Sequence, residues 1–211
     1  MKPYTVRPSN VWRIAVHSRP ESLREFWGIS LRVSLLVILA VSGGTAFADL
    51  ADIPNYRAYS KTFSSSGQPS KGQLQDAWID GFERVIYLAF GDHDSSLEGE
   101  DRVVKELGME YVNIPVNWGS PTPDDFAIFA AIMQGAPKKK TLLHCQVNYR
   151  ASSFSFLYRV IHDDVSVKDA KADLDSVWTP NGIWTTLIHD VLKQHHISPE
   201  CEGCDWTPQQ H

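Results

Sequence analysis

Short apolar segments alternate with segments of helical periodicity along most of this chain, and this alternation restricts the fold more than any other feature. The predicted strands are 61–70, 84–90, 110–116 and 141–145. The predicted helices are 70–82, 100–108, 123–134, 151–163, 166–177 and 181–195. Strands that alternate with helices join by right-handed crossovers. We therefore predict an α/β fold, with a mainly parallel central sheet flanked by helices, and 141–145, too apolar for an edge, as its central strand.

An uncharged apolar run near the N-terminus, VSLLVILAV, lies between basic residues and a small-x-small motif at Ala46 and Ala48. This order is typical of a secretory signal peptide, and the run is shorter than the roughly 20 residues that span a bilayer. We predict a signal peptide with a long n-region at 1–48 and a single domain at 49–211. The protein would then be exported, to the periplasm, and would meet the membrane only through this segment. An uncleaved anchor is the alternative.

The formal charge of the exported chain excludes one class of partner. Removal of residues 1–48 takes away six of the 20 basic and two of the 25 acidic residues, which leaves a net charge of −9. A chain this acidic, with PKKK at 137–140 as its only basic cluster, is poorly suited to bind a phosphate backbone. We expect no nucleic-acid partner.

The three cysteines fall into two groups. Cys201 and Cys204 form a C-x2-C motif near the C-terminus, and export to an oxidising compartment would favour a disulfide between them. They could also stay free thiols, and a zinc site that includes His195 and His196 is the rival interpretation. Cys145 stands alone in mid-chain and is the unpaired thiol.

The segment LLHCQVNYRAS places Cys145 after a predicted strand and Arg150 just before a predicted helix. In such a turn the backbone N–H groups can converge on one point, and the helix dipole adds partial positive charge there. The same field stabilises a thiolate over a thiol. A guanidinium can bind two oxygens of a tetrahedral anion. We predict an anion site with Cys145 as nucleophile and Arg150 as anion clamp.

Neighbouring residues have predicted supporting roles. His144 can orient the loop through its ring nitrogens, and Asn148 tolerates the left-handed backbone that a mid-loop position requires. Ser152 or Ser153, in the first turn of the helix, could donate to the cysteine sulfur as it leaves. The predicted substrate-binding residues are His144, Gln146, Val147, Asn148, Tyr149 and Ser152.

The segment HCQVNYRAS resembles the signature loop of cysteine-dependent protein tyrosine and dual-specificity phosphatases. Upstream, SGQPSKGQLQDAWIDGFERVIYLAF, GMEYVNIPV and TPDDFAIF resemble the bacterial branch related to the phosphatase-like domain of beta-lactamase-hydrolase-like proteins. The resemblance implies a cysteine-phosphatase-like fold, a phosphate-bearing substrate, and no metal or other cofactor. It also implies that Cys145 attacks phosphorus to form a phosphocysteine, that Arg150 binds the equatorial oxygens, and that water hydrolyses the intermediate.

The loop departs from the usual phosphatase pattern. Four residues separate Cys145 from Arg150, where five are usual, and Asn148 stands where a glycine is usual. Rhodanese-like sulfurtransferases of a single domain also carry a four-residue spacer, and there the cysteine holds a persulfide. A sulfurtransferase that uses a Cys145 persulfide is therefore one alternative, and a non-catalytic anion-binding domain is another.

Phosphatase chemistry also requires a general acid for the leaving oxygen, commonly an aspartate in the loop after the preceding strand. Asp124 and Asp125 are the candidates there, although TPDD also has the pattern of an N-cap, a proline at N1 and a capping residue at N3. Asp92 and Asp94, in the loop after 84–90, are alternatives. An enzyme without this acid would be limited to good leaving groups such as aryl oxides.

Overall fold

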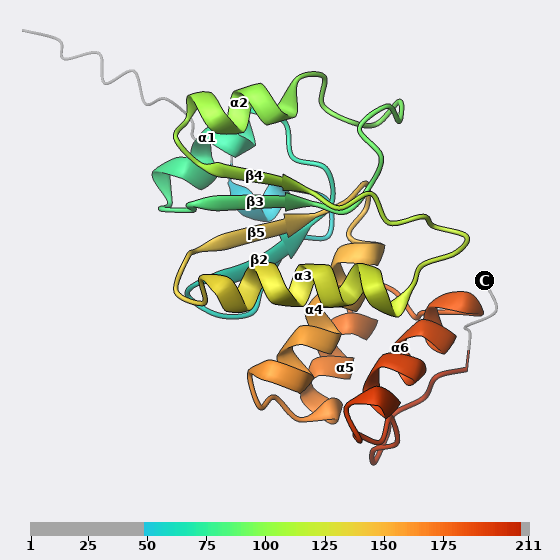
Figure 1. Ribbon diagram of the computed structural model, residues 1–211. Coiled ribbons are helices and arrows are strands. Elements are labelled where there is room, and N and C mark those ends of the chain that lie inside the picture. The colour runs from blue at the N-terminus through green and yellow to red at the C-terminus, as the bar shows by residue number, and fades with distance from the viewer. Residues whose placement is uncertain (1–48, 208–211) are drawn as a thin grey trace, which may run out of the picture. The chain divides into compact units, whose positions relative to one another are not determined.

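A five-stranded sheet lies at the centre of the computed structural model, which describes residues 49–207 (Figure 1). Its strands are β1 (Arg57–Ala58), β2 (Phe63–Ser66), β3 (Arg84–Tyr87), β4 (Glu110–Asn113) and β5 (Thr141–His144). They are ordered β1-β2-β5-β3-β4, and only the β1–β2 pair is antiparallel. The predicted α/β fold with a mainly parallel sheet is confirmed, and β5 is its central strand.

The carboxyl ends of the three inner strands lie level with one another. Ser66 at the end of β2 and Tyr87 at the end of β3 both pair with His144, the last residue of β5. All four residues of β5 are buried, as its apolar sequence predicts for a strand covered on both faces. Ligands of open parallel sheets bind outside the carboxyl ends of the strands. Cys145 lies at this place, because it directly follows His144, the last residue of β5.

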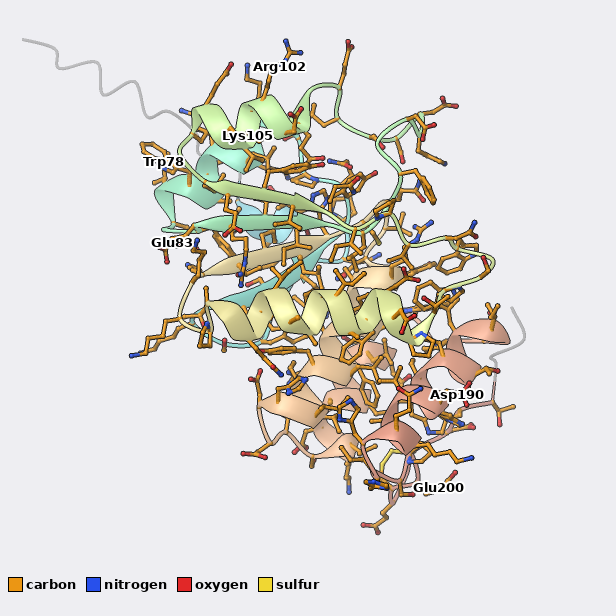
Figure 2. The ribbon with its side chains drawn as sticks, in the orientation of Figure 1. Trp78, Glu83, Arg102, Lys105, Asp190 and Glu200 are labelled. Atoms are coloured by element: carbon orange, nitrogen blue, oxygen red, sulfur yellow. A yellow bond between two sulfur atoms is a disulfide. The ribbon has the colours of Figure 1, made fainter. Side chains whose placement is uncertain are left out.

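Helices cover both faces of the sheet: α1 (Lys71–Ile79) and α2 (Glu100–Glu106) on one face, and α3 (Pro123–Gly135), α4 (Tyr149–His162), α5 (Val167–Asp175) and α6 (Ile183–Gln194) on the other (Figure 1). A single 3-10 turn, η1 (Leu50–Asp52), precedes β1. The outer face of α2 carries Arg102 and Lys105, which point away from the sheet (Figure 2). The predicted helices are therefore all present.

The helix α4 is the most deeply buried of these elements. Eleven of its 14 residues are buried, and Phe154 packs edge-on against Phe126 and lies 5.7 Å, between ring centroids, from Phe129 of α3. Its first residue is Tyr149, two positions before the predicted start at 151. The first turn was not apparent in the sequence because periodicity marks only apolar positions. Burial on nearly every side fixes the direction in which α4 leaves the loop after Cys145.

Local capping signals in the sequence were reliable. Ser70 caps α1 and forms a capping box with Gln73. Thr122 caps α3, with Pro123 at N1 and Asp125 closing the box. The strand boundaries were less accurate, since the observed strands have four residues or fewer. Neither η1 nor β1 was predicted. A two-residue strand such as β1, which depends on its partner strand, leaves no alternating pattern in the sequence.

Cys201 and Cys204 form a disulfide, which is one of the two interpretations without a metal that the motif left open. The turn they close is held against α5, where Lys171 donates to the carbonyl of Asp205 at 2.8 Å and lies 4.6 Å from the centre of the Trp206 ring. Within residues 49–207 no three metal-ligating side chains come together as a metal site would require.

None of the helices between residues 49 and 207 combines the length and the apolar character needed to cross a membrane. The signal peptide predicted at 1–48 lies outside the described residues, and it stays a prediction together with the single domain at 49–211.

Replacement of Phe154 by Ala should lower the free energy of unfolding by about 3–5 kcal/mol, because it leaves a cavity among fully packed rings. Ile128→Ala is the matched control, since Ile128 is 52% exposed on the outer side of α3, and it should cost under about 1 kcal/mol. Urea denaturation followed by tryptophan fluorescence measures both. Equal losses for the two variants would contradict this packing.

Candidate active site

A cavity of about 330 Å³ lies at the carboxyl end of β5. Five of its seven lining residues come from the segment between Cys145 and Arg150, and the other two come from the loops after β3 and β4. The lining residues are His93, Trp118, Cys145, Gln146, Val147, Tyr149 and Arg150. The structure thus brings the predicted nucleophile, the predicted anion clamp and three of the predicted loop residues to one cavity.

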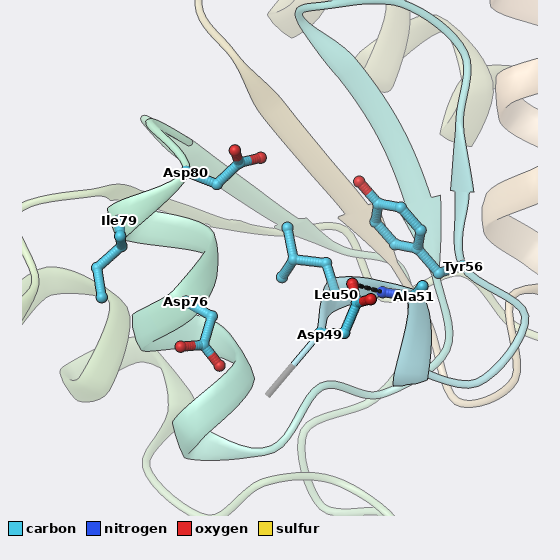
Figure 3. Close-up of a pocket in the computed structure, with 7 residues that line it drawn as sticks. All are labelled: Asp49, Leu50, Ala51, Tyr56, Asp76, Ile79 and Asp80. Carbon is cyan, nitrogen blue, oxygen red and sulfur yellow. Dashed lines mark hydrogen bonds between the residues drawn. The ribbon is translucent and has the colours of Figure 1, made fainter. Parts of the chain in front are cut away.

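A larger hollow, of about 460 Å³, lies between η1 and α1 and is lined by three aspartates and no cation or nucleophile (Figure 3). One of the three, Asp49, caps η1 by accepting from the backbone N–H of Ala51 at 3.0 Å. This hollow is larger than the cavity around Cys145, but its acidic lining would repel an anion. The chemistry of the residues selects the smaller cavity around Cys145.

The carbonyls of the loop after Cys145 are bound by two other segments of the chain. The Gln146 carbonyl accepts from the Gln68 backbone N–H at 3.0 Å, and the Val147 carbonyl accepts from Asn55 Nδ2 at 3.0 Å. Asn148 adopts the predicted left-handed conformation, with φ of 70°, and its Nδ2 donates to the Asn55 carbonyl. The loop is therefore held by its oxygen atoms.

Gly67 allows this close approach. A Cβ at this position would lie 2.9 Å from the Gln146 carbonyl oxygen and 2.9 Å from the Pro54 side chain, closer than nonbonded atoms tolerate. The glycine is required here for space, since its φ is not positive.

The backbone N–H groups of the same loop are left free for a ligand. Among the described residues, no acceptor is bonded to the N–H groups of Gln146, Val147, Tyr149 or Arg150. The last two belong to the first turn of α4, whose N-cap side chain makes no capping hydrogen bond. Free donors at a helix N-terminus, reinforced by the helix dipole, bind anions.

Cys145 and Arg150 are both almost completely buried, at 1% and 7% exposed, and Cys145 is a free thiol. Arg150 donates from Nε to the Val116 carbonyl at 3.1 Å and from Nη1 to Gln146 Oε1 at 3.4 Å. Its guanidinium lies 5.3 Å from the ring centre of Trp118. These contacts hold one edge of the guanidinium, and Nη2 has no bonded partner within residues 49–207. The free edge can bind an anion.

His144 is fixed from two sides beneath the nucleophile. Its ring stacks on Tyr87 at 4.7 Å, and its Nε2 lies 2.9 Å from Oε1 of Glu100, itself 4% exposed. The distance between these two atoms is short enough for an ion pair, although the ring N–H does not point at the oxygen. The other carboxylate oxygen accepts from Gln68 Nε2 at 3.2 Å. His144 thus connects the nucleophile to α2, a more specific role than the predicted orientation of the loop.

Tyr87, the stacking partner of His144, also anchors the loop after β3. Burial raises the pKa of Tyr87 above its usual value, so the phenol stays protonated and donates to the Phe90 carbonyl at 3.2 Å. Its oxygen also lies 2.7 Å from Ser96 Oγ. The position of this loop relative to Cys145 is therefore set by the buried stack.

An aromatic cluster forms one wall of the cavity. Tyr149 stacks on Trp178 with ring centroids 4.7 Å apart, and Trp118 lies 5.1 Å from Trp184. The Trp184 indole N–H donates to the Trp118 carbonyl at 3.1 Å. Trp118 is 41% exposed and lines the cavity. The sequence signal for Trp118 was its place in the loop after β4, at the same sheet edge as Cys145.

The predicted acid residues do not line this cavity. Asp125 Oδ2 accepts from the N–H of Thr122 at 2.9 Å and from its hydroxyl at 2.8 Å, so this carboxylate caps α3. Asp124 is exposed beside it. Asp92 and Asp94 are exposed as well. The assignment of the general acid stays a prediction.

The serines of the first turn of α4 are occupied by the helix itself. The hydroxyls of Ser152 and Ser153 donate to the Tyr149 carbonyl at 3.2 and 2.9 Å. In this geometry neither is bonded to the cysteine sulfur. Their predicted donation to a leaving sulfur would require a change of rotamer.

Glu100→Ala should destabilise the protein by about 1–3 kcal/mol, because it leaves the buried His144 ring and Gln68 Nε2 without a polar partner. Asp101→Ala is the matched control, since Asp101 forms an exposed pair with Lys105 at 3.2 Å, and its loss should change the stability little. Thermal or urea unfolding at neutral pH measures both losses. A Glu100→Ala variant as stable as the control would show that the buried pair contributes nothing.

Three solved structures that are similar to this one are described as phosphatases or as proposed phosphatases. A DUF442 protein from Shewanella putrefaciens CN-32, proposed to be a phosphatase, is 28% identical, with a TM-score of 0.63, over 69% of this chain and 93% of that one. Tk-PTP in its active form is 18% identical, with a TM-score of 0.54, over 67% of this chain and 96% of that one.

The catalytic core of the PP-IP phosphatase Siw14 from S. cerevisiae, in complex with citrate, is 11% identical, with a TM-score of 0.55, over 66% of this chain and 89% of that one. Neither a family model nor a curated protein sequence matches the chain. The similarity to Tk-PTP and Siw14 establishes the fold alone, whereas the similarity to the Shewanella protein extends to the sequence. The chain therefore has the fold of cysteine-based protein tyrosine phosphatases, and its structural neighbours are consistent with a protein-tyrosine-phosphatase-like family.

Proposed function

We propose that this protein is an exported cysteine-dependent phosphatase, which hydrolyses phosphomonoesters through a phosphocysteine intermediate. One observation carries the proposal: Cys145 and Arg150 line a single cavity, beside a loop whose carbonyls are bound elsewhere and whose N–H groups are free. That arrangement suits a phosphoryl group, which presents several oxygens to donors and its phosphorus to a nucleophile.

The reaction follows from these positions in two steps. In the first, the Cys145 thiolate attacks phosphorus, a sulfur–phosphorus bond forms, and the bond from phosphorus to the leaving oxygen breaks. The loop N–H groups and Arg150 stabilise the charge on the equatorial oxygens. In the second step, water attacks phosphorus, the sulfur leaves as thiolate, and phosphate is released.

The cavity favours substrates with a good leaving group. No carboxylate of residues 49–207 lines it, so the leaving oxygen would depart without a carboxylic proton donor close by. Aryl oxides leave more readily than alkoxides under those conditions. Trp118 and Tyr149 would provide an apolar wall for such a ring.

One feature supports export. The disulfide between Cys201 and Cys204 is the kind of bond that persists in an oxidising compartment. This part of the proposal is tested by the redox state of Cys201 and Cys204 in protein recovered from the periplasm.

The sulfurtransferase alternative rests on the four-residue spacer between Cys145 and Arg150. We expect the full chain to hydrolyse para-nitrophenyl phosphate, and to transfer no sulfur from thiosulfate to cyanide. Cys145→Ser should abolish the hydrolysis, since a hydroxyl is a far weaker nucleophile at this position. Turnover of thiosulfate without turnover of the aryl phosphate would refute the phosphatase proposal, and turnover of neither would leave an anion-binding domain.

Binding of phosphate should protect Cys145 from alkylation by iodoacetate. Arg150→Gln should weaken this protection about tenfold or more, because a charge-assisted contact is worth roughly 1.5–3 kcal/mol. Arg102→Gln is the charge-matched control: Arg102 points outward from α2 (Figure 2), and protection should be unchanged. The fraction of alkylated Cys145 is measured by mass spectrometry. Equal protection in both variants would argue against a role of Arg150 in anion binding.

A further inference from the structure

His93 lines the same cavity as Cys145 and Arg150 and has no role in the mechanism above. It comes from the loop between β3 and α2, a segment far from the Cys–Arg loop in the sequence. Of the cavity-lining residues outside that loop, it is the only one whose side chain can titrate; the other is Trp118.

The loop that carries His93 is held by several hydrogen bonds. The His93 backbone N–H donates to the Phe90 carbonyl at 3.4 Å, and the His93 carbonyl accepts from the Ser96 N–H at 2.8 Å. Ser96 Oγ donates to the Phe90 carbonyl at 3.1 Å. Tyr87, which stacks on His144, binds both Phe90 and Ser96. The His93 backbone is therefore positioned by the same buried stack that lies beneath the nucleophile.

The imidazole is oriented as well. The Ser95 backbone N–H donates to Nδ1 of His93 at 3.2 Å, and Ser95 Oγ lies 2.9 Å from the same nitrogen. A backbone N–H can only donate, so Nδ1 is the acceptor and the neutral ring carries its proton on Nε2. No acceptor of residues 49–207 is bonded to Nε2. The ring thus offers one free donor at the cavity.

The short loop makes such a donor useful. Four residues between Cys145 and Arg150 supply one backbone N–H fewer than a five-residue spacer supplies, while a phosphoryl group still presents three equatorial oxygens. We propose that His93 is a phosphate ligand of this site, and that its Nε2–H donates to an oxygen of the phosphoryl group. This inference rests on the proposed function and adds a ligand from outside the Cys–Arg loop.

Isothermal titration calorimetry of the full chain with inorganic phosphate, at one fixed pH above neutrality, tests the inference. His93→Ala should weaken phosphate binding about tenfold, the value of one hydrogen bond to a charged group, and should raise KM for para-nitrophenyl phosphate similarly. His93→Gln keeps an N–H donor and should recover part of the affinity. Glu98→Gln is the control on the same exposed loop, and phosphate binding should not weaken.

The possible outcomes separate this inference from the proposed function. Wild-type protein that binds and hydrolyses phosphate esters, with a His93→Ala variant of unchanged phosphate affinity, would overturn the role of His93 alone. A lower kcat with unchanged phosphate affinity would make His93 a proton donor, and would equally overturn its assignment as a phosphate ligand. Wild-type protein that binds no phosphate would overturn the proposed function and this inference together. His93 is exposed, so thermal unfolding midpoints should agree among the variants and exclude misfolding.

Discussion

The candidate site depends first on the position of β5 between β2 and β3. The register that aligns Ser66, His144 and Tyr87 brings the carboxyl ends of three buried strands to one level, and Cys145 follows there with 1% of its surface exposed. Parallel strands buried on both faces cannot slip without exposing apolar side chains. The rigidity of the site therefore comes from the core of the sheet rather than from the loop.

The loop after Cys145 can bind an anion because its backbone carbonyls and its backbone N–H groups are used differently. Its carbonyls are bound by residues from two distant segments, at Asn55 and Gln68, while its N–H groups remain free. A loop that satisfied both sets internally would have nothing to offer a ligand. Asn148 makes the division possible, because its left-handed backbone turns the chain into α4 at Tyr149, one residue before Arg150.

Buried polar side chains beneath the loop after Cys145 support its position. Glu100 and His144 form a contact at 2.9 Å inside the sheet edge, and Tyr87 connects His144 to the loop that bears His93. Buried charges are costly unless they are paired, so the arrangement is sensitive to the loss of any one member. The loop after Cys145 and the loop after β3 are consequently coupled through one stacked pair of rings.

Several parts of the structure were accessible from sequence because their causes are local. The capping box at Thr122 and the strand–loop–helix order around Cys145 each depend on residues a few positions apart. Glu100 and His93 were missed for the opposite reason. A glutamate at a helix start and a histidine in a polar loop have ordinary local explanations, and only their distances to His144 and to the cavity distinguish them.

The sequence by itself determined the α/β class, the central place of the 141–145 strand, and the Cys–Arg pair with Asn148 between them. These follow from hydrophobic periodicity, from the apolar character of one segment, and from the backbone preference of one residue. The tertiary structure alone decided which side chains from outside the loop reach the cavity, namely Trp118 and His93. It also decided that Asp124 and Asp125 lie outside the lining of this cavity. Such choices depend on how strands far apart in sequence align, and no local pattern encodes that alignment.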